Sequence, residues 1–194
     1  MKRRIPLFPL NAVLFPGGVL PLRVFEPRYL DMVSESLKTG SGIGVVLIRE
    51  GEETGAAAET HEVGTLSEIS YWHKRPDGLL GLTLRGEQRF RILSREVLPS
   101  QLIMAQVELL PPARPCPLDN TYQALVDMLR QIMGQLEPPY SKLVPDYKDA
   151  TWVSARLVEL LPLELAEKQK LLASDDARHR LDEIAAHLSG MDLL

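Results

Sequence analysis

Prolines constrain the start of this chain more than any other residue type. Within residues 5–29, prolines at positions 6, 9, 16, 21 and 27 interrupt an otherwise apolar run. Each proline fixes its own φ near about −65° and removes a backbone donor, so the stretch cannot form one long helix. It predicts short, edge-like strands joined by tight turns, followed by a helix that begins at Pro27, because proline is favoured in the first helical turn.

A second proline cluster divides the chain. Residues 111–117 contain four prolines, which favour an extended connector over helix or strand. We therefore predict a β-rich subdomain at 1–112, a linker at 113–118 and a helical-bundle subdomain at 119–194. The fold class expected from this is α+β, with an N-terminal β-barrel-like mixed sheet that carries one helix, followed by a small C-terminal helical bundle.

The two halves differ in their hydrophobic period. Short apolar or alternating runs predict strands at 43–48, 62–73, 79–84, 89–97 and 104–110. A helix is expected at 27–39, with Leu30, Val33 and Leu37 on one face. Residues 76–78 have the composition of a hairpin turn, and the acidic stretch 51–60 predicts a mobile loop. After the linker, apolar residues at helical spacing predict helices at 122–136, 152–161, 163–173 and 175–188.

Composition restricts the setting and the partners. The chain of 194 residues has a net charge of −4, with all of the acidic excess in its helical half, and this predicts no nucleic-acid partner. No run of eighteen apolar residues occurs, so no membrane span is expected. The single cysteine, Cys116, excludes a disulfide within the chain, and we expect a cytoplasmic protein.

Catalytic and ligand-binding motifs are missing from the sequence. The glycine-rich stretch 40–44 lacks the lysine of a phosphate-binding loop, and His61 lacks a second imidazole four residues on, where Thr65 stands. Asp175 and Asp176 sit where a helix is expected to begin, which favours capping over catalysis. We predict a protein that is not an enzyme, with no catalytic, cofactor-binding or metal-binding residues and no cofactor.

Several segments carry a family likeness. They are the proline-interrupted unit 5–29 and residues 64–66, 76–78, 86–92 and 160–172. In this order and spacing they resemble the N-terminal domain of the Lon protease family, over about residues 5–188. That domain is the substrate-recognition module that precedes the ATPase and protease parts. The resemblance implies a stand-alone, PUA-like, non-catalytic module without the ATPase and protease parts. Such a module would bind unfolded or flexible polypeptide, or a protease or chaperone partner. Its role would be that of an adaptor or a holder of unfolded or damaged proteins.

Four aromatic residues are candidate polypeptide contacts: Phe25, Tyr29, Trp72 and Trp152. Aromatic side chains are enriched at binding hot spots. In the alternative interpretation, Glu26 caps the helix start and pairs with an arginine while Phe25 and Tyr29 pack beneath the barrel. Trp72 and Trp152 either meet across a cleft between the subdomains or pack in the two cores.

Two further alternatives stay open. Arg85, Arg89, Arg91 and Arg95 recur at even spacing and are expected on one face of a strand, either solvated or attracting acidic peptide. The second functional class is a small-molecule-sensing or regulatory interaction domain, by analogy with the related arrangement in cereblon. The zinc domain that holds the ligand there needs cysteines that this chain lacks.

Overall fold

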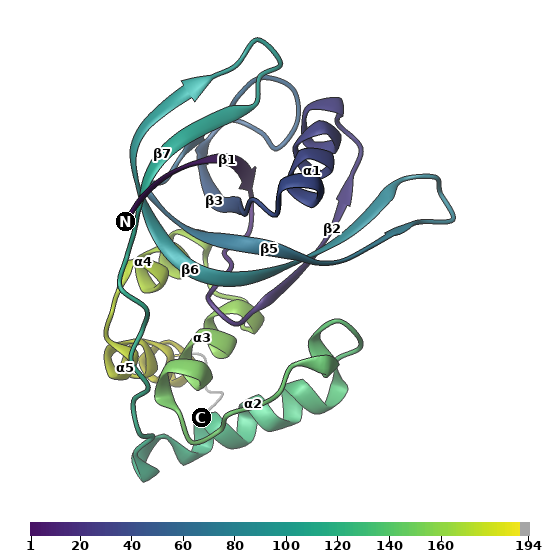
Figure 1. The fold of residues 1–194 in the computed structure, drawn as a ribbon. Coiled ribbons are helices and arrows are strands. Elements are labelled where there is room, and N and C mark those ends of the chain that lie inside the picture. Colours follow the sequence, from purple (N-terminus) through teal and green to yellow (C-terminus); the bar gives the residue numbers. More distant parts are fainter. Residues whose placement is uncertain (191–194) are drawn as a thin grey trace. The chain divides into compact units, whose positions relative to one another are not determined.

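The chain forms two compact units, which we describe separately. A computed structural model describes residues 1–190; the last four residues of the predicted helical range 119–194 lie outside this part. Unit 1 is Met1–Pro112 and unit 2 is Ala113–Leu194. The expected α+β class is confirmed, with strands in unit 1 and helices in unit 2 (Figure 1).

Unit 1 is built on strands that close into a ring. Its elements in chain order are β1 (Lys2–Leu10), β2 (Val19–Val24), α1 (Pro27–Thr39), β3 (Ile43–Glu50), β4 (Glu59–Thr60), β5 (Val63–Lys74), β6 (Leu80–Val97) and β7 (Ile103–Leu109). Within residues 1–190 these strands form one sheet in the order β1-β7-β6-β5-β3-β4, and β1 also pairs with β3. The β1–β3 pair is parallel and the others are antiparallel, so the sheet is mixed and its ring β1-β7-β6-β5-β3 is closed.

Strand β1 tolerates its prolines because each of its halves has one neighbour. Residues 2–6 pair with β7, and residues 7–10 pair with β3. Pro6 and Pro9 can therefore turn their missing donors to the unpaired side. The expectation for residues 5–29 is confirmed: β1 is followed by a turn in which the Gly18 N–H donates to the Phe15 carbonyl over 3.0 Å, then by β2 and by α1.

Strand β6 is longer than predicted. The strands expected at 79–84 and 89–97 are one strand, Leu80–Val97, because Gly86 lets the chain continue between them. Gly86 donates to the Gly18 carbonyl over 3.0 Å and accepts from the Gly17 N–H over 2.8 Å. A Cβ at this position would lie 2.2 Å from the Phe15 carbonyl oxygen, so only glycine fits without a shift of the backbone.

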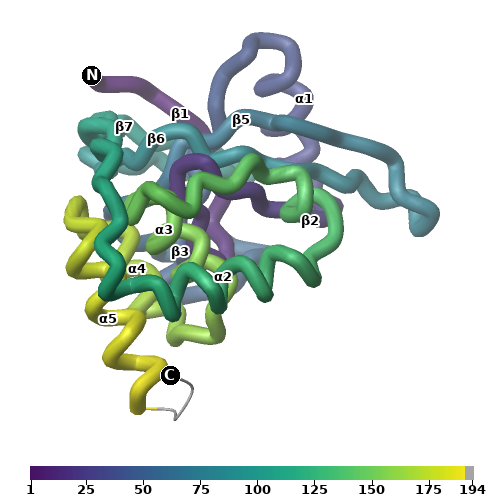
Figure 2. Tube along the Cα trace, turned by 90° about the horizontal axis from the view of Figure 1, so that it is seen from below, coloured from purple at the N-terminus to yellow at the C-terminus, as the bar shows by residue number. Residues whose placement is uncertain are grey.

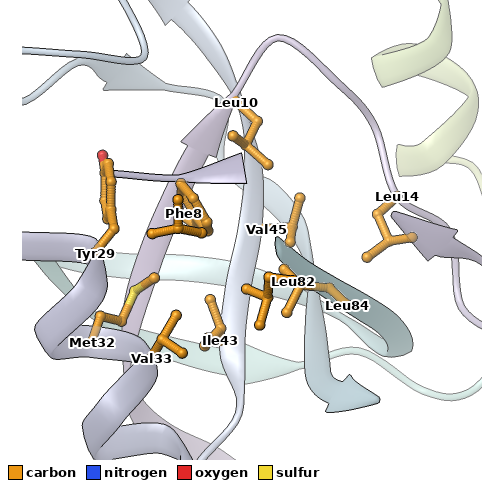
Figure 3. Packing of buried hydrophobic residues seen from close by; sticks show 11 residues of the cluster. Phe8, Leu10, Leu14, Tyr29, Met32, Val33, Ile43, Val45, Leu82 and Leu84 are labelled. Carbon is orange, nitrogen blue, oxygen red and sulfur yellow. The ribbon is translucent and has the colours of Figure 1, made fainter. Parts of the chain in front are cut away.

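Helix α1 covers the core of unit 1. Its buried side chains include Tyr29, Met32 and Val33, which pack with Phe8, Ile43, Leu82 and Leu84 of the strands (Figure 3). The helix begins and ends where the sequence predicts, with Gly40 as a left-handed C-cap at φ 67°. The predicted core face is wrong in two positions, since Leu30 and Leu37 are exposed. The buried stripe of α1 consists of Arg28, Tyr29, Met32, Val33 and Ser36.

Unit 2 consists of short helices. They are α2 (Gln123–Gln135), α3 (Ala150–Leu160), α4 (Leu165–Ala173) and α5 (Ala177–Ser189), with 3-10 turns η1 (Asn120–Tyr122) and η2 (Tyr140–Lys142). Aspartates cap three of the starts, because the side chains of Asp119, Asp149 and Asp176 accept backbone N–H groups of η1, α3 and α5. The proline-rich segment is held against the start of α3, where Cys116 N–H donates to Asp149 over 2.8 Å.

The fit at Gly86 gives a stability prediction. The Gly86→Ala variant should lose about 1–3 kcal/mol of unfolding free energy, because the new methyl group overpacks against the Phe15 backbone. The matched control is Gly134→Ala in the last turn of α2, where a Cβ meets nothing within 4 Å; this substitution should add up to about 0.5–1 kcal/mol. Urea unfolding followed by circular dichroism measures both. Equal stability of Gly86→Ala and the wild type would contradict the close approach.

Candidate functional site

The candidate site lies where β2, β6 and β5 run side by side. We call residues 19–24, 80–85 and 68–74 the arm; β2 pairs with one edge of this part of β6, and β5 pairs with the other. The β5–β6 hairpin extends beyond the remaining strands of unit 1 (Figures 1 and 2). It carries large side chains outside the closed ring.

The turn at the tip of the arm follows the predicted hairpin. Arg75 N–H donates to the Leu79 carbonyl over 2.9 Å, and Gly78 has a φ of 84°. Asp77 accepts the Leu79 N–H and pairs with Arg75 at 3.1 Å. The pKa of Asp77 is lowered, mainly by the hydrogen bond from the Leu79 N–H and to a smaller extent by the hydrogen bond from Arg75. This carboxylate is therefore charged at neutral pH and fixes the turn.

Aromatic side chains are exposed on both faces of the arm and beside it. Tyr71 is 61% exposed, Trp72 is 56% exposed, and Phe25, directly after β2, is 53% exposed. Paired residues of neighbouring strands share a face, so Trp72 lies on the face of its partner Leu82, while Tyr71 points to the opposite face. There the Tyr71 ring stacks on the His73 ring, with centroids 5.4 Å apart.

Tyr29 belongs to the core and not to this surface. It is 5% exposed, its ring centroid lies 4.4 Å from that of Phe8, and burial raises the pKa of its phenol. This placement fits the packing interpretation for Tyr29, whereas the exposure of Phe25 fits the binding one. Sequence reasoning did not single out Tyr71, although its place one residue before Trp72 at a strand end was a usable signal.

Arg28 holds the base of α1 in place. Its side chain is buried, its Nε lies 2.9 Å from a carboxylate oxygen of Glu26, and its guanidinium lies over the Tyr29 ring. It also donates to the carbonyls of Gln101, at 2.9 Å, and Glu53, at 3.4 Å. Glu53 belongs to the stretch that was expected to be a mobile loop, and it also accepts the Asn11 N–H at 2.6 Å. The loop is thus tied to α1 and to the end of β1.

The arginines of β6 do not share one solvated face. Arg85, Arg91 and Arg95 are exposed, but Arg89 is only 5% exposed, so this part of the prediction is wrong. The pairing of β5 with β6 shifts register between Leu66 and Ser67, which breaks the regular alternation. Arg95 donates to the carbonyls of Thr60 and His61, both at 3.1 Å, and so holds β4 against β6.

Trp152 lies in unit 2, on α3. It is partly exposed, with an edge-to-face contact to Tyr147 at a centroid distance of 5.5 Å. Arg156 approaches the same ring at 5.9 Å. A meeting of Trp72 and Trp152 across a cleft stays a prediction, as does a binding role for each of the four aromatic residues.

The described part of the chain shows neither a metal-binding cluster nor a membrane-spanning helix. Among residues 1–190, no three His, Cys, Asp or Glu side chains come together as a group that could hold a metal ion. In the same range, no helix has the length and apolar character needed to cross a bilayer.

Comparison with known proteins decides the family. Residues 4–190 match the sequence profile of the ATP-dependent protease La (LON) substrate-binding domain. The chain belongs to this family of Lon substrate-binding domains. The matched region is the substrate-binding part, and it contains neither the ATPase nor the protease part of Lon.

Solved structures and curated relatives agree with this membership. A Lon N-terminal domain protein from Xanthomonas campestris is 35% identical, with a TM-score of 0.78, and the match covers 95% of this chain and 98% of that one. The N-terminal domain of Mycobacterium avium complex Lon protease shares the fold, with a TM-score of 0.63 and 18% identity. The match covers 96% of this chain and 98% of that one. Lon protease of Parabacteroides distasonis is 29% identical over 91% of this chain, which spans 22% of that relative's length. The Flavobacterium johnsoniae enzyme is 27% identical over 95% of this chain, which spans 24% of it.

The buried ion pair gives a second stability prediction. Arg28→Met should lose roughly 3–5 kcal/mol of unfolding free energy, because the substitution leaves the largely buried Glu26 carboxylate without its positive partner. The control is Arg4→Met, which breaks the solvent-exposed Arg4–Glu96 pair and should lose less than about 1 kcal/mol. Chemical denaturation compares the two. Equal losses would show that the Arg28 contacts do not hold α1 and its loops.

Proposed function

We propose that this Lon substrate-binding domain recognises unfolded or flexible polypeptide segments through the arm and the adjoining Phe25. The observation that supports the proposal most is the exposure of Phe25, Tyr71 and Trp72 within and beside one three-stranded arm. Exposed clusters of large apolar side chains are typical of interaction sites. Tyrosine and tryptophan are also favoured at interfaces, because they combine a large apolar surface with a polar group.

Recognition of this kind uses side-chain burial and no reaction. An apolar segment that covers the Trp72 ring or the Phe25 ring removes that ring from water, which favours an apolar partner segment over a folded, polar surface. In this proposal Tyr29 has a packing role in the core of unit 1, where its ring contacts Phe8. Trp152 is a further contact, on unit 2.

The family suggests the role that such binding serves. The curated relatives are named Lon protease, and this chain corresponds to their substrate-binding part. We infer a non-catalytic module that works in the cytoplasm as an adaptor or holder of unfolded or damaged proteins, by itself or together with a protease or chaperone. Nucleic acid is not a partner in this proposal.

Alanine substitution tests the surface directly. The probe is a fluorescently labelled protein kept unfolded by reduction and carboxymethylation of its cysteines. The double variant Phe25→Ala/Trp72→Ala should raise the Kd for this probe by about thirtyfold or more, since interface aromatics contribute more than about 1 kcal/mol each. Fluorescence anisotropy gives the Kd values.

Two controls make the result specific. Leu93→Ala removes a 47% exposed apolar side chain from β6 outside the arm and should leave the Kd unchanged. The folded, oxidised form of the probe should bind wild type more weakly than the unfolded form. Equal Kd values for the double variant and the wild type would show that the arm is not the binding surface. A separate Trp152→Ala variant tests the contact on unit 2.

A further inference from the structure

The hydrogen-bond pattern of the arm shows which backbone groups face outward. In an antiparallel pair, hydrogen-bonded and non-hydrogen-bonded residue pairs alternate along the ladder. The Arg75 N–H donates to the Leu79 carbonyl, so Arg75–Leu79 is a hydrogen-bonded pair and the next pair, Lys74–Leu80, is not. By the same alternation His73–Gly81 is hydrogen-bonded and Trp72–Leu82 is not. The backbone N–H and C=O groups of Trp72 and Lys74 therefore point away from β6, toward the outer edge of β5.

This edge has no strand beside it in the described part of the chain. Strand β3 pairs with β5 only at Thr65, Leu66 and Ser67, and its ladder ends before the arm begins. From Ser70 to Lys74 the residues of β5 are exposed. An exposed strand edge with free donors and acceptors is a template for another strand.

The opposite edge of the arm is blocked. Strand β2 pairs with β6 along its length, and Gly86 N–H donates to the Gly18 carbonyl next to this ladder. Counting from that bond, Pro21 and Thr83 form a non-hydrogen-bonded pair, so the nitrogen of Pro21 faces outward. The Ser70 hydroxyl donates to the Thr83 carbonyl at 3.0 Å, which confirms that Thr83 turns toward β5. A proline in this position prevents strand addition on the β2 side.

We propose that the outer edge of β5, from Ser70 to Lys74, binds its client by strand addition, taking an extended polypeptide segment as an extra strand of the arm. This proposal rests on the proposed function and specifies its binding mode. The backbone groups of Trp72 and Lys74 bond to the added strand. The Trp72 ring on one face and the Tyr71 ring on the other cover its side chains, so the segment carries apolar residues on both faces.

Charge at the tip of the arm favours an acidic end on this segment. Lys74 directly precedes the Arg75–Asp77 ion pair, and Arg23, which pairs with Gly81 of β6, is close enough to Asp77 to contribute to the lowering of its pKa, so the tip has an excess of positive charge. A carboxylate of the added strand near Lys74 is attracted, and a lysine there is repelled. A second copy of this chain is a poorer occupant, because the open edge is short and stable dimers bury about 1,200 Å² or more.

Proline at the open edge tests the mode of binding. Lys74→Pro removes the outward N–H without removing a bond to β6, and Lys74→Ala removes the same side chain but keeps the N–H. The probe is a labelled peptide of alternating valine and tyrosine, which has apolar surface on both faces, with glutamate at both ends. Lys74→Pro should bind it about tenfold more weakly than Lys74→Ala, since one backbone hydrogen bond is lost and the proline ring keeps the added strand away.

Amide hydrogen exchange on the wild-type chain gives an independent readout. The peptide should slow exchange at the N–H groups of Trp72 and Lys74, a change that side-chain contact by itself does not produce. Thermal melting shows whether the Lys74→Pro variant is folded. If this variant is unfolded, the exchange experiment on the wild-type chain decides whether the peptide binds by strand addition.

The outcomes separate the two proposals. If wild type binds the peptide and the unfolded protein probe, but Lys74→Pro equals Lys74→Ala and the two amides stay unprotected, strand addition is wrong and the proposed function stands. If wild type binds neither probe, both proposals are wrong. If sedimentation shows a dimer in which these amides are already protected without peptide, the edge belongs to a second copy and the inference is overturned.

Discussion

The fold of unit 1 depends on the two pairings of β1. Its first half joins β7 in an antiparallel ladder, and its second half joins β3 in a parallel one. This closes the ring β1-β7-β6-β5-β3, so the strands inside it have no open edges. Closure also fixes the core that α1 covers, in which Tyr29 and Met32 pack against Phe8 and Ile43. Without the β1–β3 ladder, β3 would lose one of its neighbours and the core would open to water.

The arm is the part of the sheet that closure leaves out. Strand β6 is longer than the ring requires. Its first half pairs with β2 and with the second half of β5, and these three segments extend beyond the closed ring. The polar contacts of Arg28 hold the start of α1 against the two loops that contain Glu53 and Gln101. Proline on one edge and free backbone groups on the other give the arm one side suited to an incoming strand.

Local signals predicted most of this fold, and long-range pairing explains what they missed. Pro27 and Gly40 gave the bounds of α1, and residues 76–78 gave the hairpin, because turn and cap chemistry is local. The continuity of β6 through Gly86 and the burial of Arg89 depend on the approach of the Phe15 loop and on a register shift, which no local pattern contains. Phe25 and Trp72 were named from residue type, whereas the exposure of Tyr71 and the open edge of β5 required the strand pairing.

The central claim is that unfolded polypeptide binds at the arm. Photo-crosslinking measures this most directly: an unfolded polypeptide carrying benzophenone groups is bound to the intact chain, irradiated, and the attachment sites are read by mass spectrometry. We expect crosslinks concentrated at residues 23–25 and 69–79. Crosslinks confined to other surfaces of the chain, with none in these two segments, would contradict it.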